Sequence, residues 1–125
     1  MPKKILIIED DPVIVKYLQA VFSDNGYATC TAGSSSEGLD VVRRETPDLI
    51  TLDLQLPGEW GPRFYRKLRK DKDLKDIPVI VVTAKAQSID RVLGLHIARV
   101  DDYITKPFGP QELLESVERV LSSKN

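Results

Sequence analysis

The sequence has little of what disulfide-rich and metal-binding proteins use: among 125 residues it holds one cysteine, Cys30, and one histidine, His96. A single cysteine excludes an internal disulfide framework and predicts a buried free thiol in a reducing compartment. A single histidine excludes a metal site built on histidines, and we expect His96 on the surface of a helix. No apolar run approaches the roughly 20 residues of a membrane span. The apolar run after Lys4 is also too short for a secretory signal, so a cytoplasmic protein is expected.

The chain also lacks an excess of charge of either sign. The chain carries 18 basic and 19 acidic residues, which gives a formal net charge of −1. This balance does not predict a nucleic-acid or membrane surface, and we expect neither as a direct partner. The length suits a single domain with one core, and no linker or repeat divides it.

Apolar runs alternate regularly with helical patterns along the chain. Strands are expected at Lys4–Glu9, Tyr27–Ala32, Leu49–Asp53, Val79–Thr83 and Asp102–Thr105. Helices are expected at about 12–24, 35–46, 62–71, 88–98 and 110–121. Uninterrupted apolar strands are typical of parallel sheets that are buried on both faces. Five strands alternating with five helices predict a doubly wound α/β domain.

Local signals mark the ends of these helices. Asp11 is a good N-cap for the first helix, with Pro12 at the first helical position, and Asn25 with Gly26 supplies its end. Ser34 with Glu37 forms a capping box for the second helix.

The expected topology brings three carboxylates together. The second strand is the weakest, which suits a sheet edge and predicts the flavodoxin-like order 2-1-3-4-5. Ligands bind where the winding of such a sheet reverses, here between strands 1 and 3. Strand 1 ends in Glu9 and Asp10, and strand 3 ends in Asp53. A lone aspartate would be interpreted as a turn cap, but three converging carboxylates predict a site.

Electrostatics favours a cation in this cluster. Two unit charges about 4 Å apart repel by roughly 4 kcal/mol at an effective dielectric constant of 20. Oxygen ligands without cysteine or histidine are typical of Mg²⁺ sites. Thr83 and Lys106 end the two remaining strands of the same sheet edge. A metal, a carboxylate nucleophile, a hydroxyl and an ammonium group are the parts that phosphoryl transfer to an aspartate needs.

Four motifs resemble the receiver domain of two-component response regulators, and the resemblance covers essentially the whole chain, 1–125. The motifs are Glu9-Asp10-Asp11, Asp53 with Pro57-Gly58 and Gly61, Val82-Thr83-Ala84, and Asp101-Asp102-Tyr103-Ile104-Thr105-Lys106-Pro107-Phe108. Each follows the expected strand. All four motifs occurring together and in this order are specific for the receiver domain.

The resemblance implies a role for each matching residue. Asp53 would accept the phosphoryl group, with Thr83 and Lys106 binding its oxygens. Mg²⁺ would be held by Asp10, Asp53, the backbone carbonyl of Gln55 and, through a water, Glu9. Tyr103 matches an aromatic switch residue, and the Lys106–Pro107 bond is expected to be cis. The only chemistry implied is Mg²⁺-dependent phosphorylation of Asp53 and its reversal.

The resemblance also implies partners and an output. A histidine kinase or histidine phosphotransfer protein would donate the phosphoryl group, and helix 4, strand 5 and helix 5 would present the signal. Arg99-Val100 replaces the family's usual Gly-Ala, so helix 4 is expected to end differently. Ser116 and Glu118 stand where winged-helix transcription factors carry basic dimer residues. We therefore expect a stand-alone or kinase-derived receiver without an effector domain, monomeric or weakly dimeric.

Three alternatives remain beside a phosphorylation switch. A haloacid dehalogenase-type phosphatase would need an Asp-x-Asp motif after strand 1, which Glu9-Asp10-Asp11-Pro12 does not supply. An interaction module that works without phosphorylation would not need the full set of site residues. A flavodoxin would need a hydroxyl- and glycine-rich turn after strand 1.

Overall fold

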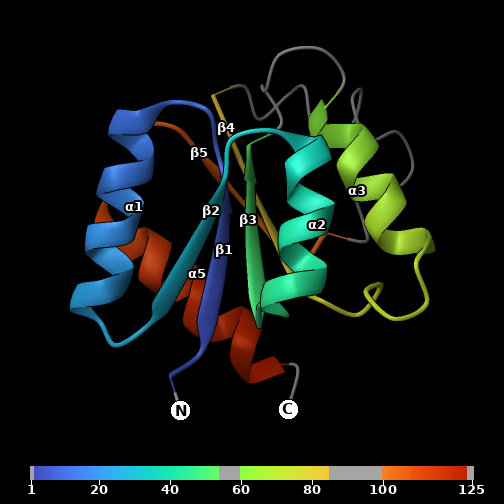
Figure 1. Ribbon diagram of the computed structural model, residues 1–125. Helices are drawn as coiled ribbons and strands as arrows, with labels where there is room; N and C mark the ends of the chain where they lie inside the picture. The colour runs from blue at the N-terminus through green and yellow to red at the C-terminus, as the bar shows by residue number, and fades with distance from the viewer. Residues whose placement is uncertain (1, 54–59, 85–99, 124–125) are drawn as a thin grey trace.

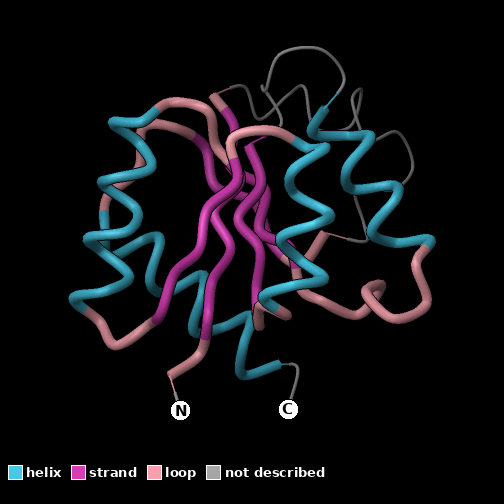
Figure 2. Tube along the Cα trace, in the orientation of Figure 1, coloured by secondary structure: helices cyan, strands magenta, loops and turns pink. Residues whose placement is uncertain are grey.

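The computed structural model describes residues 2–53, 60–84 and 100–123 (Figure 1). A parallel sheet of five strands runs through its centre (Figure 2). The strands are β1 (Lys4–Ile8), β2 (Ala28–Ala32), β3 (Leu49–Asp53), β4 (Val79–Thr83) and β5 (Asp102–Thr105). Their order is β2-β1-β3-β4-β5, which confirms the predicted order.

Four helices are described: α1 (Pro12–Asp24), α2 (Ser35–Glu45), α3 (Trp60–Lys70) and α5 (Pro110–Ser123). The helix expected at 88–98, with His96, lies outside the described residues, as does Arg99. Of the described helices, none has the length and apolar character to cross a bilayer.

Side chains alternate across the sheet and build two cores. Leu6, Ile8 and Leu52 point to the face that α2 and α3 cover, where they pack on Val42, Phe64 and Leu68. Ile5, Ile7 and Ile80 point to the other face, where they pack on Leu18 and Phe22 of α1 and Leu113 and Val117 of α5. Because both faces are covered, every position of β3 is buried. This is why the strands read as continuous apolar runs.

The helix ends follow the predicted capping. The Asp11 side chain accepts a hydrogen bond from the Val13 amide at 2.9 Å, and the Ser34 hydroxyl accepts one from the Glu37 amide at 3.3 Å. Gly26 follows α1 with φ +87°, a conformation that glycine adopts without steric cost. Short polar side chains therefore satisfy amides that the first turns leave unpaired.

Some local predictions were wrong. Val13 and Tyr17 follow the helical spacing of the buried residues of α1, yet their side chains are 74% and 39% exposed. They lie near the start of α1, beyond the cover that the sheet and α5 provide. Cys30 is half-buried, because β2 is an edge strand. Helix α3 begins at Trp60, two residues earlier than expected.

Gly38 marks a close approach between α2 and α3. A Cβ atom there would lie 3.0 Å from Cε1 of the buried Phe64 and 3.3 Å from Cδ1 of Ile8. We expect Gly38→Val to lower the free energy of unfolding by about 1–3 kcal/mol through overpacking. Gly38→Ala should not gain the roughly 0.5–1 kcal/mol usual for replacing a helical glycine.

Urea unfolding of both variants tests this prediction. Gly33→Ala is the matched control, since nothing lies within 4 Å of a Cβ there. A clear stabilisation by Gly38→Ala would contradict the close approach.

Candidate functional site

The carboxyl ends of the strands carry the acidic residues of the site. Asp53 is the last residue of β3, and Glu9 directly follows β1. The register pairs Ile8 with Leu52, so the next residue of each strand lies at the same level of the sheet. The Glu9 amide still donates to the carbonyl of Ala32 on β2, at 3.2 Å. Strand pairing therefore fixes where both carboxylates emerge.

Three carboxylates meet at this edge, as the sequence predicts. Oxygen atoms of Glu9, Asp10 and Asp53 all lie within 4.8 Å of one another. Glu9 and Asp53 are each only 4% exposed, whereas Asp10 is exposed. The cluster is thus buried on one side and open to solvent on the other.

Lys106 supplies positive charge to the cluster from the loop after β5. Its Nζ atom lies 3.2 Å from Oε2 of Glu9 and 3.3 Å from Oδ2 of Asp53. The bond from Lys106 to Pro107 is cis, as the resemblance implies. Lysine and carboxylates that are far apart in the chain therefore converge on one point.

The pKa values show that one lysine does not balance the cluster. Burial and then the neighbouring Asp53 raise the pKa of Glu9, Lys106 lowers it by a smaller amount, and the net result is a pKa of about 7. Burial acts to lower the pKa of Lys106, but the charges of Asp53 and Glu9 outweigh it, so that this pKa is raised. A divalent cation would supply the missing positive charge.

The donor set fits Mg²⁺. Glu9, Asp10 and Asp53 offer only carboxylate oxygens, which hard divalent cations prefer. The exposed side of Asp10 leaves space for the waters that Mg²⁺ retains. Glu9, Asp10 and Asp53 are therefore the residues of the described chain that could hold the ion.

The remaining predicted site residues are described to different degrees. Thr83 ends β4 and is paired in register with Thr105. Tyr103 lies on β5 with its side chain 49% exposed. Gln55 lies outside the described residues. The structure thus brings Glu9, Asp10, Asp53 and Lys106 together, and it places Thr83 at the end of a neighbouring strand.

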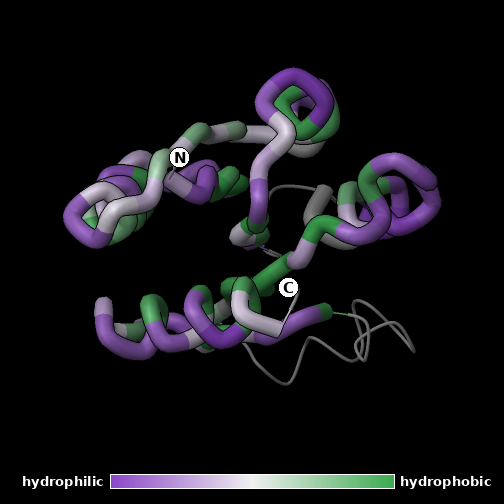
Figure 3. Tube along the Cα trace, turned by 90° about the horizontal axis from the view of Figure 1, so that it is seen from below, coloured by the Kyte–Doolittle hydropathy of each residue, from purple (hydrophilic) through white to green (hydrophobic). Residues whose placement is uncertain are grey.

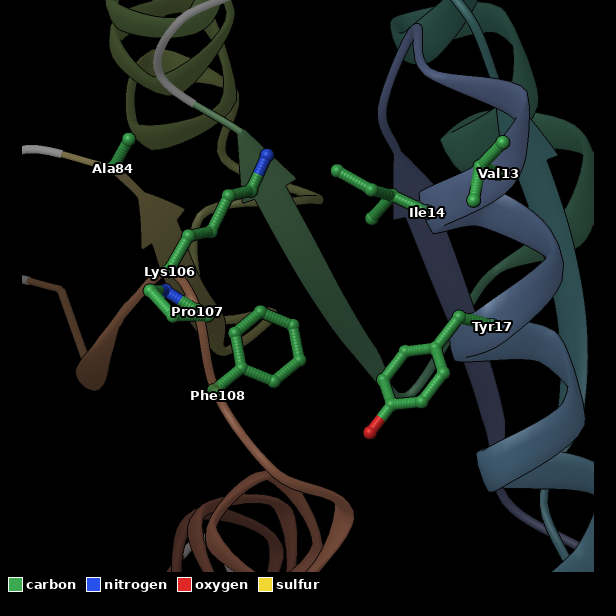
Figure 4. A pocket seen from close by; sticks show the side chains of 7 residues that line it. All are labelled: Val13, Ile14, Tyr17, Ala84, Lys106, Pro107 and Phe108. Carbon is green, nitrogen blue, oxygen red and sulfur yellow. The ribbon is translucent and has the colours of Figure 1, made fainter.

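The structure contains an apolar groove beside Lys106 that the sequence analysis did not predict. It has a volume of about 510 Å³ and lies between α1 and the loop after β5. Figure 4 shows the Tyr17 ring of α1 opposite Phe108, and Ile14 pointing across the groove toward the tip of Lys106. The Tyr17 and Phe108 rings are 6.2 Å apart. Val13 and Tyr17 have the same helical spacing as core residues. Periodicity alone does not show which part of a helix is covered by the sheet and which part is exposed.

A second unpredicted feature ties β5 to α5. Asp102 accepts a hydrogen bond from the Ser116 hydroxyl at 2.6 Å and forms an ion pair with Arg119. Burial alone would raise the pKa of Asp102, but these two donors outweigh it and the pKa is lowered. Ser116, noted in the sequence only as a missing basic residue, is 2% exposed and holds β5 against α5.

Comparison with known proteins agrees with this site. The family model of the response regulator receiver domain matches residues 5–118. The chain is 41% identical over 117 residues to the DNA-binding response regulator MtrA of Mycolicibacterium smegmatis. This alignment covers 94% of this chain and 50% of that protein. It is 37% identical over 121 residues to the phosphate regulon transcriptional regulatory protein PhoB of Escherichia coli, at 97% and 52% coverage. The chain belongs to the response regulator receiver domain family.

Solved structures show the same fold. The receiver domain of the sensor histidine kinase PA1611 from Pseudomonas aeruginosa aligns with a TM-score of 0.87 and 28% identity, covering 98% of this chain and 99% of that one. That structure has a magnesium ion coordinated in its active site cleft. Receiver domains bind Mg²⁺ in their active site, and this chain has an acidic cluster of Glu9, Asp10 and Asp53.

One prediction about partners is wrong. The sequence predicted no direct binding of nucleic acid. The relatives include a DNA-binding response regulator and a transcriptional regulatory protein, and the chain spans about half the length of each. The prediction relied on net charge and on where the chain ends, and neither reports what a receiver controls.

The raised pKa of Glu9 predicts a pH dependence of stability in metal-free protein. A folded-state pKa of about 7, above the ordinary value of 4.5, means that folding favours the protonated form. This contribution is fully present below about pH 4.5 and is lost as the pH rises through 7. Without Mg²⁺, we expect Glu9→Gln to gain stability over wild type progressively from pH 5 to pH 8.

Urea unfolding in the presence of a chelator measures this difference at each pH. Taking the difference between variant and wild type cancels the titration of other carboxylates. Glu112→Gln, an exposed change on α5, is the matched control. A gain for Glu9→Gln that stays constant from pH 5 to pH 8 would contradict the raised pKa.

Proposed function

We propose that the chain is a phosphorylation switch in which Asp53 accepts a phosphoryl group from a phospho-histidine donor protein. The supporting observation is the position of Asp53: it is buried, 3.3 Å from the Lys106 ammonium group and beside two further carboxylates. A family match supports the same class of function. The cytoplasmic location expected from the sequence stays a prediction.

Group transfer follows from this geometry. One carboxylate oxygen of Asp53 attacks phosphorus and forms the P–O bond. The P–N bond to the donor imidazole breaks, and its electron pair returns to the imidazole nitrogen. Lys106 offers a positive charge to a phosphoryl oxygen, where preorganised charge stabilises the transition state. In hydrolysis a water oxygen would attack phosphorus, the P–O bond to Asp53 would break with its electron pair returning to the carboxylate, and the proton of the water would pass to solvent.

Mg²⁺ would neutralise charge on the phosphoryl oxygens when it is bound. We propose Asp10 and Asp53 as direct ligands, with Glu9 acting through a water and the backbone carbonyl of Gln55 completing the set. The burial of Glu9 supports an indirect role, because Asp10 is exposed and open to solvent whereas Glu9 is only 4% exposed.

The apolar groove gives the donor protein a surface to approach. Val13, Tyr17 and Phe108 line it directly beside Lys106. An exposed apolar patch next to the reacting carboxylate would exclude water from the transfer and orient the donor.

Phosphorylation would alter a surface that includes β5 and α5. New phosphoryl oxygens beside Lys106 and Thr83 would compete for Lys106, which now binds both Glu9 and Asp53. Tyr103 lies on β5 and is half-exposed, so an inward movement of its ring would bury apolar surface. We propose that this movement transmits the signal. In a longer protein it would control a DNA-binding half, as in the regulators that this chain resembles.

The acceptor can be tested directly. With Mg²⁺ and a small acyl phosphate donor, we expect one phosphoryl group per chain, stable to acid and labile to base and hydroxylamine. Asp53→Asn should remove it and keep the fold, because one charge leaves a repulsive cluster. Mass spectrometry measures the added group, and omitting Mg²⁺ is the control. A persistent mass shift in Asp53→Asn would show that another residue is the acceptor.

The switch can be tested by amide chemical shifts with and without beryllofluoride, which mimics the phosphoryl group. In wild type, shifts should spread from Asp53 to Tyr103 and α5. Thr83→Ala should still accept phosphate and lose most of the shift at Tyr103, whereas Lys106→Ala should impair both. Shifts that stay confined to the residues around Asp53 in wild type would rule out transmission through β5 and α5.

A further inference from the structure

Helix α3 has an unusual charge pattern. It carries Arg63, Arg66, Lys67, Arg69 and Lys70 and no acidic residue, whereas α1, α2 and α5 each carry both signs. Of the five, only Arg69 is turned into the protein, where it forms an ion pair with Asp101 and lies over the Tyr65 ring. The other four side chains are exposed.

These four residues form one stripe. Arg63, Arg66, Lys67 and Lys70 follow the spacing i, i+3, i+4 and i+7, which places them on one side of a helix. Phe64, Tyr65 and Leu68 occupy the opposite side and are buried. At 1.5 Å per residue the stripe is roughly 10 Å long. Figure 3 shows the hydrophilic outer side of α3, the helix at the right.

Helix α2 extends the basic surface. Arg43, in its last turn, is 56% exposed and bonds to Asp71, the residue that follows α3, at 3.0 Å. Arg44 beside it is 67% exposed. Six exposed basic side chains therefore lie on α2 and α3, and the two on α2 are each paired with an acidic side chain, Asp71 or Glu45. We call Arg43, Arg44, Arg63, Arg66, Lys67 and Lys70 the basic face.

This arrangement works against helix stability. Like charges at i, i+3 and i, i+4 destabilise a helix, and Arg63 with Lys67, and Lys67 with Lys70, are such pairs. Only the basic residues of the last turn are favoured by the helix dipole. A surface that served solubility alone would mix both signs, as α2 does. The stripe therefore indicates an anionic partner.

Two anionic occupants are available for comparison. A second copy offers Glu112, Glu115 and Glu118 on the exposed side of α5. Exposed ion pairs are individually weak, and a few of them do not offset the freedom that two proteins lose on association. A nucleic-acid backbone instead releases condensed counterions for every phosphate neutralised, which gains affinity without close packing. Closely spaced phosphates also match a stripe of closely spaced cations.

We propose that the basic face binds the phosphate backbone of double-stranded DNA without sequence preference. The net charge of −1 conceals this surface, because acidic residues elsewhere balance it, among them those of the metal site, of α5 and of α2 itself. Binding of this kind contacts phosphates and reads no bases. It is independent of Asp53 chemistry, so that the loss of either property leaves the other intact.

Fluorescence anisotropy with a labelled 20-base-pair duplex of arbitrary sequence tests the proposal. With about four phosphates neutralised, log K against log [salt] should have a slope near −3.6, which corresponds to roughly 100-fold weaker binding between 50 and 200 mM salt. Arg63→Ala with Lys67→Ala should reduce the slope by about two and weaken binding at least tenfold at 50 mM salt.

Lys3→Ala with Lys16→Ala is the matched control, since it removes the same charge from exposed positions outside α2 and α3. The control should bind like wild type. Equal losses in both double variants would overturn the proposal, because net charge alone would then explain binding. So would tighter binding to poly-glutamate than to the duplex, which would identify an acidic protein as the partner, or salt-dependent self-association without duplex binding.

Discussion

The burial of two carboxylates beside one ammonium group is the constraint on which the rest of the structure depends. Glu9 and Asp53 are almost fully buried, and Lys106 lies within 3.3 Å of both. Such a cluster is tolerated only where neighbouring structure holds it in place. Parallel pairing of β1 with β3 fixes the carboxylates, and the loop after β5 brings Lys106 to them. The two apolar cores hold this sheet edge rigid against the repulsion.

Much of this organisation was predictable from the sequence, for physical reasons. Continuous apolar runs arise because α1 and α5 cover one face of the sheet while α2 and α3 cover the other. Once the strand order follows from the weak strand β2, the ends of β1 and β3 must be neighbours, and Glu9 and Asp53 must meet. Lys106 follows in the same way, because it comes directly after β5 at the same edge of the sheet, and the resemblance adds its role.

Other features could not be predicted, because the sequence pattern does not show which part of a helix is left exposed or which charged side chains lie close together in space. Val13 and Tyr17 have core-like spacing but line an open groove, since the sheet stops short of the start of α1. Ser116 is an inconspicuous residue in the sequence, yet its hydroxyl and Arg119 determine the ionisation of Asp102. The position of Thr83 is predictable from its strand, whereas the orientation of Tyr103 depends on its neighbours.

The net charge of the chain also says little about where its charges lie. The sum of −1 includes an acidic cluster at one sheet edge, an acidic side of α5 and the basic face, whose α2 part also carries acidic residues. Screening limits each region to about 8 Å at physiological salt. An approaching macromolecule therefore meets the charge of one region and not the sum. The acidic site attracts a cation, while the basic face on the opposite side of the sheet from α5 attracts an anion. One small domain can bind both because the sheet and its two cores separate them.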